Sequence, residues 1–117
     1  MSKPLETGVR VQGDVAIIDL KGEIDGLGDA ALQQAYAEAD GHRPGAVLLN
    51  FAGVDYINST GIALIVGILA RARKDRRRLL TTGLSEHYRH LFTITRLSDF
   101  MTIAPDEATA LREVANG

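Results

Sequence analysis

Four small polar residues, Asn58-Ser59-Thr60-Gly61, carry the clearest potential for chemistry in this chain. They lie between two apolar segments, residues 46–57 and residues 62–70. The first segment is typical of a buried strand and the second of a buried helix. A strand that ends in such residues and turns into a helix presents free backbone N–H groups and a hydroxyl at one exposed point. We therefore predict that this junction is the working site, with Ser59 at its centre.

A simple helix cap is the alternative interpretation of the same residues. Asn and Ser are both strong N-cap residues, so capping alone would explain Asn58 and Ser59. The position nevertheless favours a site, because open α/β sheets place ligands beyond the carboxyl ends of their strands. The nucleophile elbow of α/β-hydrolases is absent, because position 57 is Ile instead of Gly. His87 or His90 could in principle complete a catalytic triad, although no spacing in the sequence defines its geometry.

The histidine and cysteine content argues against a metal site. The 117 residues include no cysteine, which rules out disulfides and thiol chemistry. His87 and His90 could share one face of a helix, but two ligands do not make a zinc site. The third histidine, His42, falls in a predicted loop and is expected to be solvated. We predict no metal and no cofactor.

Composition and charge limit the partners. The formal net charge is -2, and hydrophobic residues make up 45% of the chain, as in an ordinary globular protein. A basic run follows the apolar segment after Gly61, at Arg71, Arg73, Lys74, Arg76, Arg77 and Arg78. It lacks interleaved aromatic residues, so a solvated helix end is favoured over direct nucleic-acid binding, with the rim of a protein interface as a third reading.

No segment has the character of a membrane anchor or a signal peptide. The longest apolar run, residues 61–70, is about half of the ~20 residues that a spanning helix needs. The first six residues lack the apolar core of a signal peptide. A cytoplasmic protein without membrane contact is the expectation.

The strands that must hold the junction follow from apolar patterning. Residues 9–12 alternate and residues 15–20 are apolar in the middle, so they predict an antiparallel hairpin around Gly13-Asp14. Residues 46–51 predict a central strand, followed by an excursion through Gly53 and Asp55, and Ile57 is expected to be the last buried residue before the junction. The chain is expected to leave the sheet at residues 21–26. A further strand is predicted at residues 78–83, parallel to the central strand. Leu97 and residues 100–103 are expected to form a short closing strand or an extended packing segment.

Four helices complete the predicted pattern. The first carries an apolar stripe at Leu32, Ala35, Tyr36 and Ala39. The second follows Gly61 and is apolar nearly all round, which predicts burial on two sides. The third begins after Ser85, and the fourth begins near Pro105 with a stripe at Ala108, Leu111 and Ala115. Residues 1–117 are thus expected to form one α/β domain with a mixed central β-sheet and about four helices.

Taken together, these motifs resemble the STAS domain, named for sulphate transporters and anti-sigma-factor antagonists. The closest likeness is to its stand-alone bacterial antagonists of anti-sigma factors. Gly22-Glu23-Ile24-Asp25 is similar to the family's Gly-Glu-Leu-Asp, and residues 47–57 match its central strand and the approach to its site. Asn58-Ser59-Thr60-Gly61-Ile62 matches the signature Asp-Ser-Ser/Thr-Gly-Leu. The resemblance covers nearly the whole chain.

The resemblance implies a switchable binding protein without catalytic activity of its own. It implies that Ser59 is phosphorylated by the anti-sigma factor, which is itself a serine kinase, and that a metal-dependent serine phosphatase reverses the reaction. The unmodified form would bind the anti-sigma factor and free the sigma factor. The implied partner-binding loop comprises Glu23, Asp25, Asn58, Ser59, Thr60 and Gly61.

One residue departs from the family pattern, because Asn58 stands where the family has Asp. An amide caps a helix about as well as a carboxylate, but it also donates hydrogen bonds. The change therefore bears on kinase recognition more than on the fold. Two alternatives follow: a STAS docking subunit of a lipid-transport or signalling assembly without phosphorylation, and a nucleotide-binding site at the Ser59 helix N-terminus.

Overall fold

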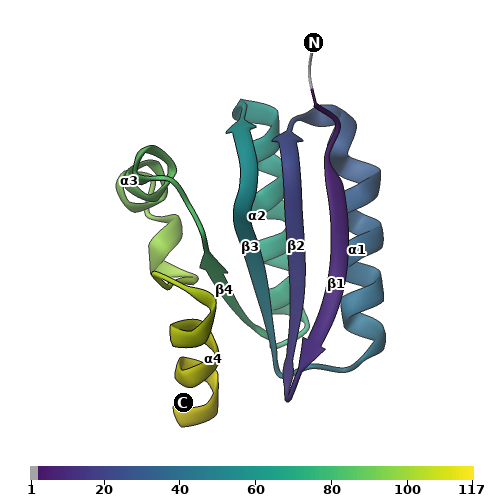
Figure 1. Cartoon of the computed structure of the whole chain (residues 1–117), viewed down its shortest axis with the longest axis vertical. Helices are drawn as coiled ribbons and strands as arrows, with labels where there is room; N and C mark the ends of the chain where they lie inside the picture. Colours follow the sequence, from purple (N-terminus) through teal and green to yellow (C-terminus); the bar gives the residue numbers. More distant parts are fainter. Residues whose placement is uncertain (1–2) are drawn as a thin grey trace.

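Five strands form one mixed sheet in the computed structural model, which describes residues 3–117 (Figure 1). The strands are β1 (Glu6–Gln12), β2 (Val15–Ile24), β3 (Ala46–Ile57), β4 (Arg78–Thr82) and β5 (Thr102–Ile103). Their spatial order is the order of the chain. β1 and β2 are antiparallel, and every later neighbour pair is parallel. The predicted hairpin and the parallel arrangement of β3 and β4 are confirmed.

Four α-helices pack on the two faces of this sheet within the described residues. They are α1 (Asp29–Gly41), α2 (Ser59–Lys74), α3 (Glu86–Ile94) and α4 (Glu107–Asn116), with short 3-10 turns η1 (Gly26–Gly28) and η2 (Leu97–Asp99). In Figure 1, α1 and α2 lie together behind the sheet and α4 lies on the opposite side, near β4. The predicted α/β class and the number of helices are confirmed.

Alternation along β2 and β3 divides their apolar side chains between two cores. Ile18 and Leu49 belong to the larger core, which includes Tyr36 of α1 and Ile68 of α2. The smaller core contains Val15, Ile17, Ala46, Leu48, Leu80, Ala104 and Ala110. Burial on both faces explains why the central strands have continuous apolar runs instead of an alternating pattern.

The expectation that the chain leaves the sheet after residue 20 and again after residue 51 is wrong. β2 continues to Ile24 and β3 continues to Ile57. The two segments pair with each other, with Gly22 opposite Val54 and a register shift on either side of Lys21-Gly22. Irregular pairing tolerates glycines that otherwise signal a strand end. This extension places Ile24 and Ile57 side by side where the sheet ends.

The prediction that α2 is covered on two sides is also wrong. Ile65, Ile68 and Leu69 are buried, whereas Val66 keeps 41% of its surface exposed. Ala63 is exposed as well. The sheet and α1 cover only one side of α2, because α4 packs on the opposite face of the sheet.

The predicted stripe of α4 needs a similar correction. Ala110 is buried, and Leu111 and Val114 pack against the smaller core. Ala108 and Ala115 are exposed. Leu111 was predicted correctly, but the buried side of the helix is centred on Ala110 instead of the expected Ala108 and Ala115.

The basic run at the end of α2 makes structural contacts. Arg77 pairs with Asp40 of α1 and Arg78 pairs with Glu113 of α4. The Arg71 guanidinium lies 4.5 Å from the centre of an aromatic ring of α1. The Arg73 guanidinium lies 4.9 Å from the centre of the Phe100 ring, so four of the six basic residues contact other parts of the fold. The run lies at a helix end, as predicted, but it is less solvated than expected. No helix within residues 3–117 is long and apolar enough to cross a bilayer.

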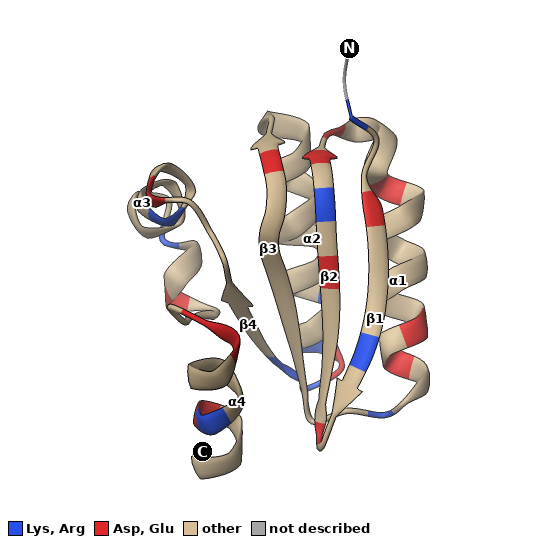
Figure 2. Cartoon of the chain, in the orientation of Figure 1, with Lys and Arg blue, Asp and Glu red and all other residues tan. Residues whose placement is uncertain are grey.

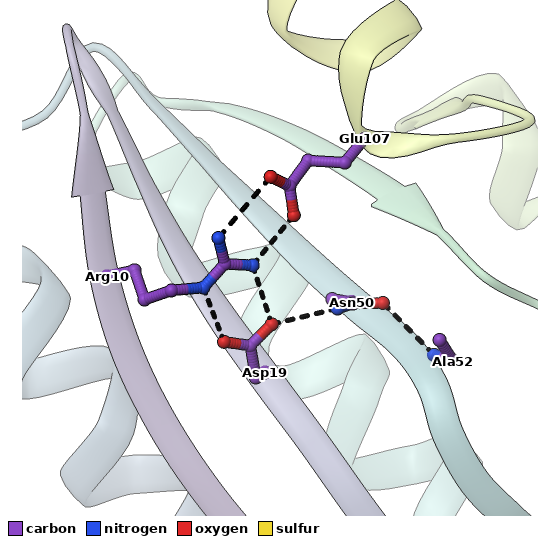
Figure 3. Close-up of polar contacts among 5 residues, drawn as sticks. All are labelled: Arg10, Asp19, Asn50, Ala52 and Glu107. Atoms are coloured by element: carbon purple, nitrogen blue, oxygen red, sulfur yellow. Dashed lines mark hydrogen bonds and ion pairs between the residues drawn. The ribbon is translucent and has the colours of Figure 1, made fainter.

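A polar cluster joins α4 to strands β1, β2 and β3 (Figure 3). We define the Arg10 cluster as Arg10 of β1, Asp19 of β2, Asn50 of β3 and Glu107 of α4. The Arg10 guanidinium donates to Asp19 at 2.6 and 2.9 Å and to Glu107 at 2.7 and 3.3 Å. The Asn50 amide donates to Asp19 at 2.8 Å. The cluster therefore links three strands and the first turn of α4.

Candidate functional site

The junction between β3 and α2 is an N-capped strand-to-helix turn. Asn58 is extended, with φ -89° and ψ 179°, and its side-chain oxygen accepts a hydrogen bond from the Gly61 N–H at 2.8 Å. The Asn58 carbonyl accepts from the Ile62 N–H at 2.9 Å. Asn58 is therefore the cap residue, and its side chain pairs one of the N–H groups that have no partner within the helix.

Ser59 and Thr60 occupy the first turn of α2, and both are exposed. Within residues 3–117, no side-chain hydrogen bond involves the hydroxyl of Ser59 or Thr60. Because Asn58 caps the helix, the Ser59 hydroxyl is free to face solvent. The first N–H groups of the helix lie beside it, where a negative charge is stabilised.

Gly61 is required by the close approach of β2. A Cβ at this position would collide with the carbonyl oxygen of Ile24. The Asn58 N–H donates to the same carbonyl at 3.2 Å. Gly26 lies close by as well, because a Cβ on it would be 3.3 Å from the Thr60 methyl group. The end of β2 thus packs directly on the first turn of α2.

Two acidic residues of the predicted loop, Glu23 and Asp25, lie at this end of β2. Glu23 is paired with Tyr56 of the neighbouring strand. Glu23 and Asp25 are both half-buried. The Asp25 carboxylate accepts from the Leu27 N–H at 3.0 Å and so caps η1. Figure 2 shows acidic positions at the ends of both β2 and β3. The structure brings all six predicted loop residues together at the carboxyl ends of β2 and β3.

Tyr88 of α3 is a residue of this site that the sequence analysis missed. Its hydroxyl accepts a hydrogen bond from the Ile57 N–H at 2.8 Å and lies 3.3 Å from the Ile57 carbonyl oxygen. Its place on the apolar side of an amphipathic helix gave no sign of this contact. The only available signal was the hydroxyl itself, because a partly buried tyrosine needs a polar partner.

A cleft of about 370 Å³ separates the junction from α3. Its lining includes Ser59, Ile62, His87, Tyr88 and Leu91. A larger cleft of about 570 Å³, between the N-terminal segment and the ends of β2 and β3, is not lined by residues of the junction. Of these two clefts, the one beside α3 is the one that Ser59 lines.

The histidines do not form a catalytic arrangement with the serine. His87 and His90 are exposed on α3, and neither hydrogen-bonds to Ser59 among the described residues. The His87 ring packs edge-on against the Tyr88 ring, with 4.9 Å between centroids. Residues 3–117 also contain no cluster of three side chains that could hold a metal ion. The triad that His87 or His90 could have completed is not assembled.

Comparison with known proteins gives the family. Residues 7–104 match a family model described as "Mlab, STAS domain". The chain belongs to the STAS domain family, which confirms the resemblance inferred from the sequence.

Curated relatives are anti-sigma factor antagonists. The anti-sigma-B factor antagonist of Staphylococcus epidermidis is 40% identical over 57 residues, which cover 49% of this chain and 53% of that protein. The match thus spans about half the length of this relative. The anti-sigma-F factor antagonist RsfB of Mycobacterium tuberculosis is 28% identical, over 80% of this chain and 88% of that protein.

Solved structures share the whole fold. A crystal structure of an anti-sigma factor antagonist from Mycobacterium paratuberculosis has a TM-score of 0.82 at 22% identity and covers 98% of this chain and 99% of its own. The Bacillus cell fate determinant SpoIIAA in its phosphorylated form has a TM-score of 0.71 at 20% identity, over 93% of this chain and 99% of that chain.

Proposed function

We propose that this protein is an anti-sigma factor antagonist switched by phosphorylation of Ser59. The observation that carries the proposal is the exposed Ser59 hydroxyl at the N-terminus of α2, left free because Asn58 caps the helix. The names of the relatives support the antagonist role. The unphosphorylated protein binds an anti-sigma factor with serine kinase activity and frees the sigma factor. A metal-dependent serine phosphatase restores that form.

The proposed partner-binding loop comprises Glu23, Asp25, Asn58, Ser59, Thr60 and Gly61. Among the described residues no side chain hydrogen-bonds to the Ser59 hydroxyl, so nothing there activates it as a nucleophile. We accordingly propose a substrate and binder, not an enzyme. Such a role places the protein in the cytoplasm as one domain over residues 1–117, in contact with neither nucleic acid nor membrane.

The switch would act on the surface of the molecule. A phosphoserine adds about -1.5 to -2 charges at neutral pH. At the N-terminus of α2 this charge is favoured by the helix dipole and by free N–H groups. The fold is therefore expected to persist, while the added charge and bulk at the loop block the partner.

Binding of Ser59 variants to the cognate anti-sigma factor tests the proposal. Ser59→Ala should bind like the wild type and accept no phosphate, whereas Ser59→Asp should bind at least tenfold more weakly. Titration calorimetry measures binding, and mass spectrometry after incubation with the kinase and ATP locates the phosphate. Thr60→Ala is the matched control, because Thr60 is the neighbouring exposed hydroxyl. Equal binding by wild type and both Ser59 variants would place the interface elsewhere.

Asn58 favours one second candidate, a STAS docking subunit of a transport or signalling assembly that is not phosphorylated. The side chain caps the helix but offers no carboxylate beside Ser59. If a kinase needs that carboxylate, Ser59 stays unmodified. The wild type would then remain free of phosphate in the kinase assay, whereas Asn58→Asp would be modified. A transporter operon in place of kinase and phosphatase genes beside this gene would support the same candidate.

A further inference from the structure

The end of β3 has a strand neighbour on only one side. Pairing with β4 stops at Asn50 opposite Thr82, whereas pairing with β2 continues to Ile57 opposite Ile24. Beyond Asn50, the backbone groups of β3 that face away from β2 have no strand partner within the described residues. Backbone N–H and C=O groups that are shielded from water need another hydrogen-bonding partner. Ile57 is such a case, because it is 5% exposed.

The Tyr88 hydroxyl takes the place of the missing strand at Ile57. It accepts from the Ile57 N–H at 2.8 Å and donates to the Ile57 carbonyl oxygen, which lies 3.3 Å away. One side-chain atom thus pairs both backbone groups of a single residue. Its own helix is fixed at the start by Ser85, whose hydroxyl accepts from the Tyr88 N–H at 3.3 Å.

The contact lies directly before the candidate site in the chain. Ile57 precedes the cap residue Asn58, whose N–H donates to the Ile24 carbonyl at 3.2 Å on the opposite side. β2 and α3 therefore hold the chain from two sides, within two residues of Ser59. Movement of Ile57 would move the cap, and with it the first turn of α2.

Packing in the core accounts for an aromatic ring at position 88, but it does not require the hydroxyl. The ring is half-buried against the larger core, and a phenylalanine would fill the same space. Only the hydroxyl reaches the Ile57 backbone. Tyr56 is a contrasting case, because it precedes Ile57 in the chain, is 53% exposed, and its hydroxyl makes no hydrogen bond within residues 3–117.

We propose that Tyr88 is a positioning residue for the Ser59 site, whose hydroxyl fixes the end of β3 so that α2 presents Ser59 in one orientation to the kinase and the anti-sigma factor. The role in phosphorylation and binding rests on the proposed function. The effect on the backbone does not depend on that function and can be measured by itself. Within residues 3–117 the Tyr88 hydroxyl bonds to Ile57 and not to Ser59, so the proposed effect on Ser59 passes through Ile57 and Asn58.

Tyr88→Phe tests the proposal, with Tyr56→Phe as the matched control. Amide hydrogen exchange followed by NMR should be roughly five- to tenfold faster at Ile57–Gly61 in Tyr88→Phe, the effect expected from one lost hydrogen bond. Exchange in β1 and in the centre of β2 should stay unchanged, which shows that the fold persists. Tyr56→Phe should leave all of these rates at the wild-type value.

The second measurement is function at Ser59. Tyr88→Phe should lower the rate of Ser59 phosphorylation and the affinity for the anti-sigma factor several-fold, and Tyr56→Phe should exchange and be phosphorylated like the wild type. Unchanged exchange at Ile57–Gly61 would overturn the proposal. Faster exchange with wild-type phosphorylation and binding would also overturn it, since Tyr88 would then be structural only. If wild-type Ser59 is neither phosphorylated nor involved in binding, the proposed function fails, and the exchange data alone decide the role of Tyr88.

Discussion

At the scale of single residues, Asn58 caps α2 and so leaves the Ser59 hydroxyl free for another role. Its amide oxygen caps α2 through the Gly61 N–H, so the Ser59 hydroxyl is not needed for capping. An aspartate would accept the same hydrogen bond and add a negative charge. Asn58 therefore preserves the cap and leaves the surroundings of Ser59 less negative, which lowers the repulsion that a phosphate on Ser59 would meet.

We expect Asn58→Ala to lower the free energy of unfolding by about 1 kcal/mol, the usual contribution of an N-cap side chain. Asn58→Asp should remain within a few tenths of a kcal/mol of the wild type. Urea unfolding followed by circular dichroism measures both changes. Ser59→Ala is the control and should be nearly neutral. A loss for Ser59→Ala as large as that for Asn58→Ala would mean that Ser59 shares the capping.

At the scale of elements, the Arg10 cluster attaches α4 to the sheet on the face opposite α1 and α2. Arg10 makes two hydrogen bonds to Asp19 of β2 and two to Glu107 of α4 (Figure 3). Paired hydrogen bonds between charged groups are stronger than single neutral ones. The Arg10 hydrogen bonds hold the pKa of the Asp19 carboxyl below its ordinary value, and the Asn50 amide adds to this effect.

The lowered pKa of Asp19 predicts a dependence of stability on pH. A carboxyl whose pKa is lower in the folded protein stabilises it above the unfolded pKa, near 4, and loses this effect as the pH falls through the folded value. Asp19→Asn should thus be less stable than the wild type at pH 7, and the difference should shrink below about pH 4. Thermal unfolding across this range provides the measurement.

Glu38→Gln serves as the control for that series, because Glu38 is exposed on α1 and forms no ion pair within residues 3–117. Its free energy of unfolding at pH 7 should lie within about 0.5 kcal/mol of the wild-type value. A gap between Asp19→Asn and the wild type that stayed constant down to pH 2 would show that the Asp19 charge does not stabilise the fold.

At the scale of the whole molecule, the candidate site and the basic run lie at opposite ends of the parallel strands. The junction lies at the carboxyl end of β3, and α2 runs back to the basic residues that precede β4 (Figures 1 and 2). The longest dimension of the molecule is 40 Å. This separation leaves the basic residues free to join helices and strands, without contact with the loop that contains Ser59.

A phosphate at Ser59 should therefore change the surface and not the fold. We expect the phosphorylated protein to melt within a few degrees of the unmodified form, because the N-terminus of α2 stabilises negative charge. Differential scanning calorimetry of the two forms, with Ser59→Asp alongside, measures the shift. A phosphoform that melts many degrees lower would refute a surface mechanism and indicate local unfolding.

Local patterns in the sequence determined most of the fold. The stripe of Leu32, Ala35, Tyr36 and Ala39 predicted the buried face of α1, and all four residues are buried. The apolar runs predicted the central strands, and the turn at Gly13-Asp14 predicted the hairpin. These features follow from periodicity and turn chemistry within a few residues, so they can be predicted without the tertiary structure.

The sequence by itself also pointed to Asn58-Ser59-Thr60-Gly61 as the site, but it left open whether these residues cap a helix or form a functional surface. Only the tertiary structure decided that Asn58 caps while Ser59 is exposed, and why Gly61 must be small. It also revealed the extended pairing of β2 with β3 and the contact of Tyr88 with Ile57. These contacts join segments about thirty residues apart, and no local pattern encodes which distant backbone group a side chain will meet.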